Sequence, residues 1–229
     1  FFARRVQEEL NIPIGLIDNA WGASSAEVWT PESVFKAHPE LVESHKKIVP
    51  NKWVTVERSS LYNGMIAPLT KFKIGGALWY QGESNTANAE NYQKLFSNMI
   101  TSWRTVWQDD FPFYYVQIAP FKYGDEFSGG IVRDQQRRTL SLKNTGMAMT
   151  SDICTVEDIH PLNKQDVGLR LANIALKNHY NLLQGQEVYG PLYASSEITG
   201  NQIVINFNHA DGLYSKGKKL NLFEISNEK

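Results

Sequence analysis

The chain has 229 residues, of which 42% are hydrophobic and 21% are charged, and its formal net charge is −1. This length fits one large domain, or one domain plus part of another, and the composition is that of an ordinary globular protein. A nearly neutral chain gives no reason to expect nucleic acid or an anionic membrane surface as a partner. No apolar run approaches the roughly 18–20 residues that span a bilayer.

The amino-terminal part predicts a helix, a strand and a surface insertion. Residues 1–11 carry apolar side chains at four-residue spacing, which predicts an amphipathic helix. The run "IGLIDNA" (14–20) predicts a short buried strand that leads into the loop "WGASSAEVW". Residues 31–60 have mixed charge and weak apolar spacing, so we expect a helical insertion outside the central layer.

Strand-like and helix-like segments alternate over the middle of the chain. The expected strands span 73–81, 111–120 and 146–153, and the expected helices span 88–107, 131–142 and 163–180. This alternation predicts a parallel sheet covered by helices on both faces. Ligands bind such sheets outside the carboxyl ends of the strands. The polar clusters at 20–30, 79–85 and 152–163 each follow a predicted strand and should therefore converge on one edge.

The pattern changes after about residue 185, where apolar and polar residues alternate between Gly and Asn turns such as "TGNQ". We expect an α/β domain over 1–185 and a partial β-rich segment over 186–229, the opening strands of a β-sandwich. The chain begins within a helix, without an initiator Met, and closes on the strand-like "LNLFEISNEK". We therefore expect it to be an excerpt from a longer polypeptide.

The single cysteine, Cys154, excludes an internal disulfide framework.

The stretch "TVEDIHPLNK" (155–164) contains a candidate general base, His160. A carboxylate close to a histidine can orient one ring nitrogen, which leaves the other free to accept a proton. Asp158 and Glu157 are the near candidates for that carboxylate, and Asp152 is a more distant one. From spacing alone, a surface histidine that caps the following helix is the simpler interpretation.

Two other loops hold candidates for oxyanion binding. The backbone N–H of Gly22 could point at a developing oxyanion, although for an isolated glycine a simple turn is by far the preferred explanation. In "WYQGESN", Gln81 and Asn85 could each offer a side-chain N–H, and Glu83 could hold neighbouring loops together. The alternative for this motif is a buried polar network that closes the end of the strand.

The sequence gives weaker support for a functional role of the remaining polar residues and for other kinds of chemistry. Ser24 and Ser25 lack the G-x-S-x-G context of a nucleophile elbow, so we interpret them as loop hydroxyls or substrate contacts. The apolar "LYNGMIAPL" (61–69), with Asn63 and Gly64 in its middle, is expected to form a turn that lines the same cleft. The sequence has no phosphate-binding glycine motif, and its five histidines lack metal-ligand spacing, so we expect neither a cofactor nor a metal.

Four motifs together carry a family resemblance: "GLIDNAWGASSAEVW", "LYNGMIAPL", "ALWYQGESN" and "DIHPLNKQDVGLRLA", in this order over residues 14–172. They resemble the sialate O-acetylesterase family, a branch of the SGNH (GDSL-like) hydrolases related to the acetylxylan esterases. The resemblance implies a three-layer, flavodoxin-like α/β fold with a parallel sheet and a Ser-His-Asp type mechanism.

The resemblance also implies roles for individual residues. Gly22 would be one oxyanion donor, and Gln81, with Asn85 as its rival, would be the side-chain donor. His160 would be the general base assisted by Asp158, although Asp158 lies two residues before His160 where the superfamily commonly has three. The expected substrate contacts are Glu83, Trp21, Asn63 and Trp79, and Trp29 is a further aromatic near the cleft.

The family's nucleophilic serine lies in a Gly-Gln/Asp-Ser-Asn-Met block upstream of the helix with which this sequence begins, and no such block occurs here. We therefore expect the serine to lie outside this chain, and the chain alone to be incomplete and inactive. The expected function of the intact protein is removal of acetyl groups from sialic acids or related sugars. The alternatives are an esterase for acetylated plant polysaccharides and a non-catalytic carbohydrate-binding fragment.

The expected partners are an acetylated sugar or glycan and the remainder of the same polypeptide. The resemblance further implies a secreted or periplasmic protein.

Overall fold

A computed structural model describes the whole chain except residues 51, 125–126, 216, 218–222 and 224–229. It divides into two compact units, Phe1–Tyr189 and Gly190–Lys229. The division falls close to residue 185, where the sequence pattern changes.

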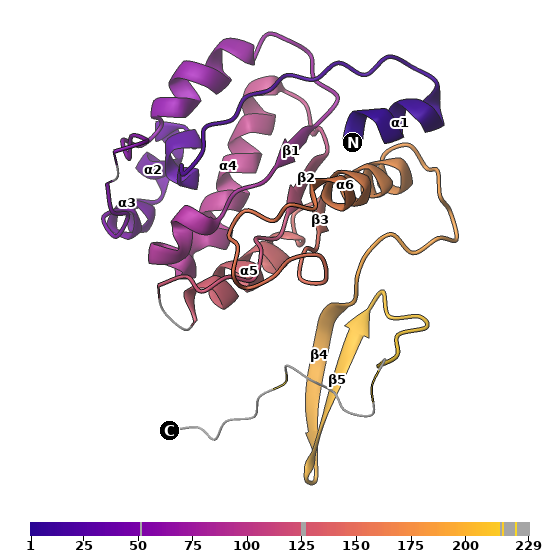
Figure 1. Cartoon of the computed structure of the whole chain (residues 1–229). Helices are drawn as coiled ribbons and strands as arrows, with labels where there is room; N and C mark the ends of the chain where they lie inside the picture. Colours follow the sequence, from indigo (N-terminus) through magenta and orange to yellow (C-terminus); the bar gives the residue numbers. More distant parts are fainter. Residues whose placement is uncertain (51, 125–126, 216, 218–222, 224–229) are drawn as a thin grey trace. The chain divides into compact units, whose positions relative to one another are not determined.

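The first unit is built on a parallel sheet with the strand order β1-β2-β3 (Figure 1). The strands span Ala77–Trp79, Phe113–Val116 and Thr145–Ala148. The predicted parallel sheet is thus confirmed, although each strand is shorter than its apolar run. Gly75 and Gly76 precede β1 and Pro112 precedes β2, and these residue types weaken a strand at its amino end.

Helices cover both faces of this sheet, which gives three layers. Successive strand residues point to opposite faces, so Tyr114 and Val116 of β2 pack against α6 (Lys164–Asn178). On the other face, the ring of Phe96 in α4 (Tyr92–Trp107) lies 5.1 Å from the Tyr115 ring. The Tyr115 hydroxyl on that face donates to Gln136 of α5 (Ser128–Thr139) at 2.8 Å.

The remaining helical elements surround these layers. They are α1 (Phe2–Leu10), α2 (Glu32–Ala37), α3 (Pro39–His45), the 3-10 segments η1 (Ala26–Trp29), η3 (Ala67–Leu69) and η4 (Glu83–Asn91), and the π-helix η2 (Tyr62–Ile66). Helix α1, which the sequence predicts, packs closely on α6. A Cβ at Gly168 of α6 would lie 2.7 Å from Phe1 Cβ, so glycine permits this approach. Within 31–60, α2 and α3 bury apolar side chains against α4 and η4 and contribute no strand to the described sheet.

The predicted strand over 14–20 is wrong. These residues form an extended connection without strand hydrogen bonds, and the Leu16 side chain is 69% exposed (Figure 1). An isolated strand has no partner for its backbone groups, and β1 pairs only with β2 in the described part of the sheet. Leu78 of β1, which α6 does not cover, is accordingly 42% exposed. The outer edge of β1 and the 14–20 segment thus both present apolar side chains to solvent.

The second unit contains an antiparallel hairpin of β4 (Leu192–Thr199) and β5 (Gln202–Asn208). The predicted turn at "TGNQ" joins these strands, with Gly200 at a φ of 62°, a conformation that favours glycine. The hairpin is the regular structure that the described residues of this unit contain, and most of "LNLFEISNEK" lies outside them.

Candidate active site

The predicted polar clusters gather at the carboxyl edge of the parallel sheet. Residues 80–85 follow β1, and the loop that carries His160 follows β3. The backbone N–H of Ala26 donates to Asn85 Oδ1 at 2.9 Å, and Ser84 Oγ donates to the carbonyl of Ala23 at 3.0 Å. The 20–30 loop is therefore attached to the loop after β1, although the strand predicted before it is absent.

Gln81 is buried, and each polar atom of its side chain has a protein partner. Its Nε2 donates to the carbonyl of Ser24 at 3.1 Å and to Asn85 Oδ1 at 2.8 Å. Its Oε1 accepts from the Tyr92 hydroxyl at 3.1 Å. Because both amide protons are used, Gln81 can reach an oxyanion only if one of these bonds opens. Its oxyanion role remains a prediction.

Asn85 is held in the same way. Its Nδ2 donates to Glu27 Oε2 at 2.9 Å and to Asn88 Oδ1 at 3.0 Å, while its Oδ1 accepts from Ala26 and Gln81. The buried polar network weighed as an alternative is therefore present. In this geometry Asn85 joins two loops rather than presenting a free N–H to the cleft.

Glu27 anchors this network, and sequence reasoning missed it. Its carboxylate is 1% exposed, and Oε1 accepts from Asn88 Nδ2 at 2.6 Å while Oε2 accepts from Asn85. Its backbone carbonyl also accepts the N–H of Ser59 at 3.1 Å. Burial lowers the pKa of the neighbouring His45, and the charge of Glu27 offsets part of that effect. The available signal was a carboxylate inside the otherwise apolar "AEVW".

Four ionisable side chains lie together where β1 and the His160 loop meet. Burial raises the pKa of Glu83, and backbone hydrogen bonding and the nearby His160 and Lys164 side chains oppose that rise. The Lys164 ammonium lies 5.0 Å from the centroid of the Tyr80 ring. Burial also raises the pKa of Tyr80, with a smaller contribution from Glu83. The structure therefore brings Glu83 and His160 to one place, as predicted.

His160 is exposed on the loop before α6. Asp158 Oδ1 accepts its backbone N–H at 2.7 Å, whereas no hydrogen bond joins its ring to a carboxylate among the described residues. Asn163 caps α6 by accepting the N–H of Asp166 at 3.1 Å, so the alternative in which His160 caps this helix is wrong. The His160 ring is thus free of a structural duty.

The acid that would orient His160 remains a prediction. Asp158 binds the backbone rather than the ring, and Glu157 is exposed. Asp152 is occupied elsewhere, since Arg170 donates to both of its oxygens at 2.7 and 2.6 Å and thereby lowers the pKa of Asp152. Among the three candidates, Asp152 therefore fits the orienting role least.

Gly22, Trp21 and Asn63 lie on neighbouring exposed loops. Gly22 is open to solvent, with no heavy atom within 4 Å of where a Cβ would stand. Trp21 is exposed beside it, and Asn63 is exposed on η2. Asn19 Nδ2 donates to the carbonyl of Met65 at 2.8 Å, which ties the two loops together. These residues are placed where a ligand could reach them.

The expected substrate contact at Trp79 is wrong. Its side chain is 8% exposed and packs among the rings of Trp29, Phe96, Trp103 and Phe113. Strand alternation points residue 79 toward α4 and away from the cleft. Trp29 is likewise buried, and Ser24 Oγ accepts from its Nε1 at 2.8 Å, which makes Ser24 a loop hydroxyl.

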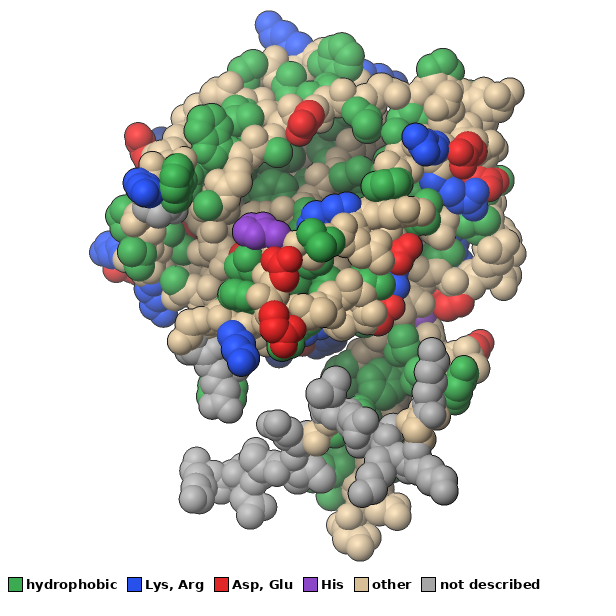
Figure 2. All heavy atoms as spheres, in the orientation of Figure 1, with side chains coloured by type: hydrophobic (Ala, Val, Ile, Leu, Met, Phe, Trp, Pro, Cys, Tyr) green, Lys and Arg blue, Asp and Glu red, His purple; other side chains and the backbone are tan. Residues whose placement is uncertain are grey.

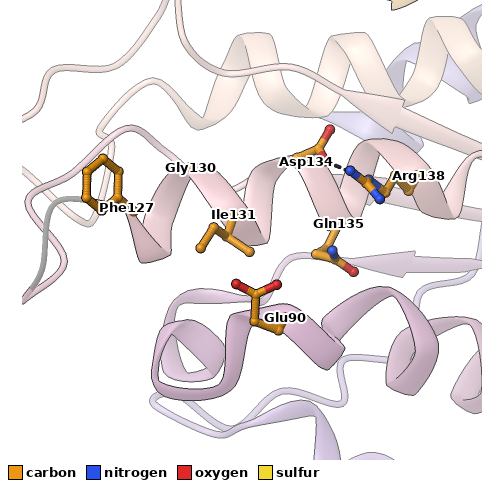
Figure 3. A pocket seen from close by; sticks show the side chains of 7 residues that line it. All are labelled: Glu90, Phe127, Gly130, Ile131, Asp134, Gln135 and Arg138. Carbon is orange, nitrogen blue, oxygen red and sulfur yellow. Dashed lines mark hydrogen bonds and ion pairs between the residues drawn. The ribbon is translucent and has the colours of Figure 1, made fainter. Parts of the chain in front are cut away.

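The pockets found on the protein surface do not coincide with the candidate active site. Figure 3 shows a pocket of about 440 Å³ between η4 and α5, lined by Glu90, Phe127, Gly130, Ile131, Asp134, Gln135 and Arg138. A second pocket of about 710 Å³ includes Pro112 and Thr145, at the amino ends of the strands. No predicted site residue lines either pocket. The face seen in Figure 2 has a hollow with hydrophobic side chains on its floor.

The described part of the chain contains no group of three or more His, Cys, Asp or Glu side chains that could hold a metal ion. None of the described helices combines the length and the apolar character that crossing a membrane requires.

The fold is a three-layer α/β fold of the SGNH-like type. The family "carbohydrate esterase, sialic acid-specific acetylesterase" matches residues 1–177, and the chain belongs to that family. Mouse sialate O-acetylesterase is 28% identical over 98% of this chain and 50% of its own length. The human sialate O-acetylesterase is 29% identical, over 98% of this chain and 47% of its own length.

A crystal structure of a carbohydrate acetylesterase from Xanthomonas citri is similar to the fold, with a TM-score of 0.78 and 32% identity. The similarity covers 90% of this chain and 46% of that one. The chain therefore spans about half the length of the curated relatives that it matches.

Proposed function

We propose that the intact polypeptide to which this chain belongs removes acetyl groups from O-acetylated sugars, sialic acids or close relatives of them. Membership of the esterase family supports the reaction class. The observation that carries the proposal is the position of His160, which lies beside Glu83 at the carboxyl edge of the sheet and does not cap α6.

The proposed mechanism uses His160 as a general base toward a serine on another segment of the polypeptide. The serine oxygen attacks the acetyl carbonyl while His160 takes its proton. The backbone N–H of Gly22 stabilises the oxyanion, together with a side-chain amide of Gln81 or Asn85 that gives up one of its present hydrogen bonds to do so. The intermediate then collapses, and His160 protonates the departing sugar alkoxide. Water repeats these steps on the acyl-enzyme and releases acetate and the free serine.

The free edge of β1 is a suitable position for the segment of the polypeptide that carries the serine. A further parallel strand beside β1 would pair with the backbone groups of its free edge, which no described strand does. Its carboxyl end would reach the same edge of the sheet as Gly22 and Gln81. One strand would therefore satisfy the unpaired backbone of β1 and deliver a nucleophile to His160.

The finer assignments are part of the same proposal. Family resemblance supports a GDSL-like enzyme that is secreted or periplasmic. Acetylated xylan remains a rival substrate to O-acetylated sialic acid, because the exposed Trp21 beside Gly22 suits either sugar.

The test uses the full-length protein and the 229-residue chain side by side. Each is incubated with a serine-directed fluorophosphonate, its intact mass is measured, and acetate release from O-acetylated sialic acid and acetylated xylan is followed. We expect one covalent adduct and acetate release from the full-length protein alone. Sugar binding by the full-length protein without an adduct or acetate would overturn the proposal in favour of a non-catalytic binding protein.

A further inference from the structure

Arg133 of α5 extends across the carboxyl ends of β2 and β3. Its Nη2 donates to Gln117 Oε1 at 3.4 Å and also contacts Ser151 Oγ. Gln117 follows β2 directly, and Ser151 lies on the loop after β3. The Nε atom is buried and has no hydrogen-bond partner, and Nη1 donates to none of the described residues. The Nε atom of this guanidinium is therefore shielded from water and has no hydrogen-bond acceptor among the described residues.

Among the described residues, Arg133 and the exposed Arg4 are the arginines without a carboxylate partner, and of the two only Arg133 is partly buried. Most other arginines pair with an acid: Arg5 with Glu9, Arg58 with Glu32, Arg104 with Asp110, Arg137 and Arg138 with Asp134, and Arg170 with Asp152. Arg133 has only the neutral oxygens of Gln117 and Ser151. Burial lowers the pKa of its guanidinium.

The neighbours of Arg133 belong to the candidate active site. Tyr123 and Cys154 both interact with its charge. Tyr123 lies close enough to Glu83 and Tyr80 for their charges to act on its phenol, and Cys154 is on the loop that carries His160. The positively charged Arg133 therefore borders the same group of side chains as Glu83 and His160.

We infer that Arg133 binds the carboxylate of an acidic sugar and so makes the site selective for O-acetylated sialic acids over neutral acetylated polysaccharides. A guanidinium with unused donors matches a planar carboxylate, which can accept two parallel N–H groups. The inference rests on the proposed function and extends it by naming the side chain that reads the acidic group. Arg133 would act as a specificity-determining residue and take no part in proton transfer.

The test measures binding separately from turnover. Calorimetry with the full-length protein compares N-acetylneuraminic acid with its methyl ester, which keeps the sugar and removes the charge. A charge-assisted interaction predicts that the acid binds about 10- to 100-fold more tightly than the ester. Arg133→Gln should remove this preference, Arg133→Lys should restore part of it, and Arg138→Gln on the same helix should leave it unchanged.

Equal binding of acid and ester by the unaltered protein would overturn the inference, and this comparison needs no variant to fold. A preference that survives Arg133→Gln would overturn it as well. An equal loss for both ligands in Arg133→Gln would mean that the residue only supports the structure. Acetate release is assayed separately, so an inactive protein that still prefers the acid would contradict the proposed function and leave the role of Arg133 supported.

Discussion

Two parts of the candidate site differ in how they are held. The loop after β1 is fixed by buried hydrogen bonds that run from Tyr92 through Gln81 and Asn85 to Glu27. The loop that carries His160 lies near the surface, and the backbone N–H of His160 donates to Asp158 Oδ1 at 2.7 Å. The protein thus fixes the strand-end amides firmly and leaves the histidine ring open.

The open histidine ring fits the expected task of His160 in ester hydrolysis, whereas Gln81 or Asn85 would have to give up one of its present hydrogen bonds before it could bind an oxyanion. Oxyanion stabilisation needs dipoles that are in place before the reaction, because their reorganisation would add to the barrier. A general base needs a partner to accept a proton from, and catalytic hydrogen bonds often tighten only when the substrate is bound. We therefore expect changes at His160 to affect the rate and changes in the Glu27 network to affect stability.

The largest effect is expected from His160→Ala in the full-length protein. Loss of the general base should lower kcat for acetate release by about 10³-fold or more. His179→Ala, at an exposed histidine whose ring contacts Tyr180 at the end of α6, is the matched control and should keep the wild-type rate. Initial rates on O-acetylated sialic acid measure the difference. Full activity in His160→Ala would contradict its assignment as the base.

The next effect is on the free energy of unfolding. Glu27→Ala removes a buried carboxylate and leaves the side-chain amides of Asn85 and Asn88 without an acceptor, which should cost about 3 kcal/mol. Urea unfolding measures this loss. Glu43→Ala, at a surface carboxylate that pairs with Lys46, should cost less than about 0.5 kcal/mol. Equal losses in both variants would show that the buried network does not fix the loop.

The smallest effect is expected at Asp152, in the more open region. Because the Arg170 hydrogen bonds lower the pKa of Asp152 in the folded state, its contribution is complete above its ordinary pKa of 3.8 and is lost as the pH falls through the lowered value. The side chain is 64% exposed, so solvent screening limits the contribution to about 1 kcal/mol or less.

Asp152→Asn should therefore be slightly less stable than the wild type at pH 7, and the gap should close under acidic conditions. Urea unfolding across this pH range, at low and high salt, checks the result. A loss of several kcal/mol would mean that the region around His160 is held as firmly as the Glu27 network.

Much of the fold could be predicted because its signals are local. The apolar stripe of α4 and the alternation of strands with helices depend on spacing along the chain, and both predictions are confirmed. The strand over 14–20 failed because strand formation also requires a neighbour. The apolar run of "IGLIDNA" is present, but no described strand pairs with it.

The candidate site was predictable only in part, for the same reason. His160 and Glu83 stand next to strand ends, so their approach follows from the topology. The engagement of Gln81 and Asn85 with Ser24 and Glu27 joins residues far apart in sequence, and no spacing rule encodes it. The misassigned Trp79 shows a further limit, because the direction of one strand residue depends on where the strand begins.

The distribution of the indole rings gives this protein two separate optical reporters. Trp29 and Trp103 each lie 6.1 Å from Trp79, and Trp107 lies 6.5 Å from Trp103, close enough for energy transfer within this group, whose emission should follow unfolding. Trp21 and Trp53 are exposed and joined by a hydrogen bond near Gly22. Their red-shifted, quencher-accessible emission should respond to a sugar at the loop while the core signal stays constant. A single fluorescence titration can therefore separate ligand binding from loss of structure.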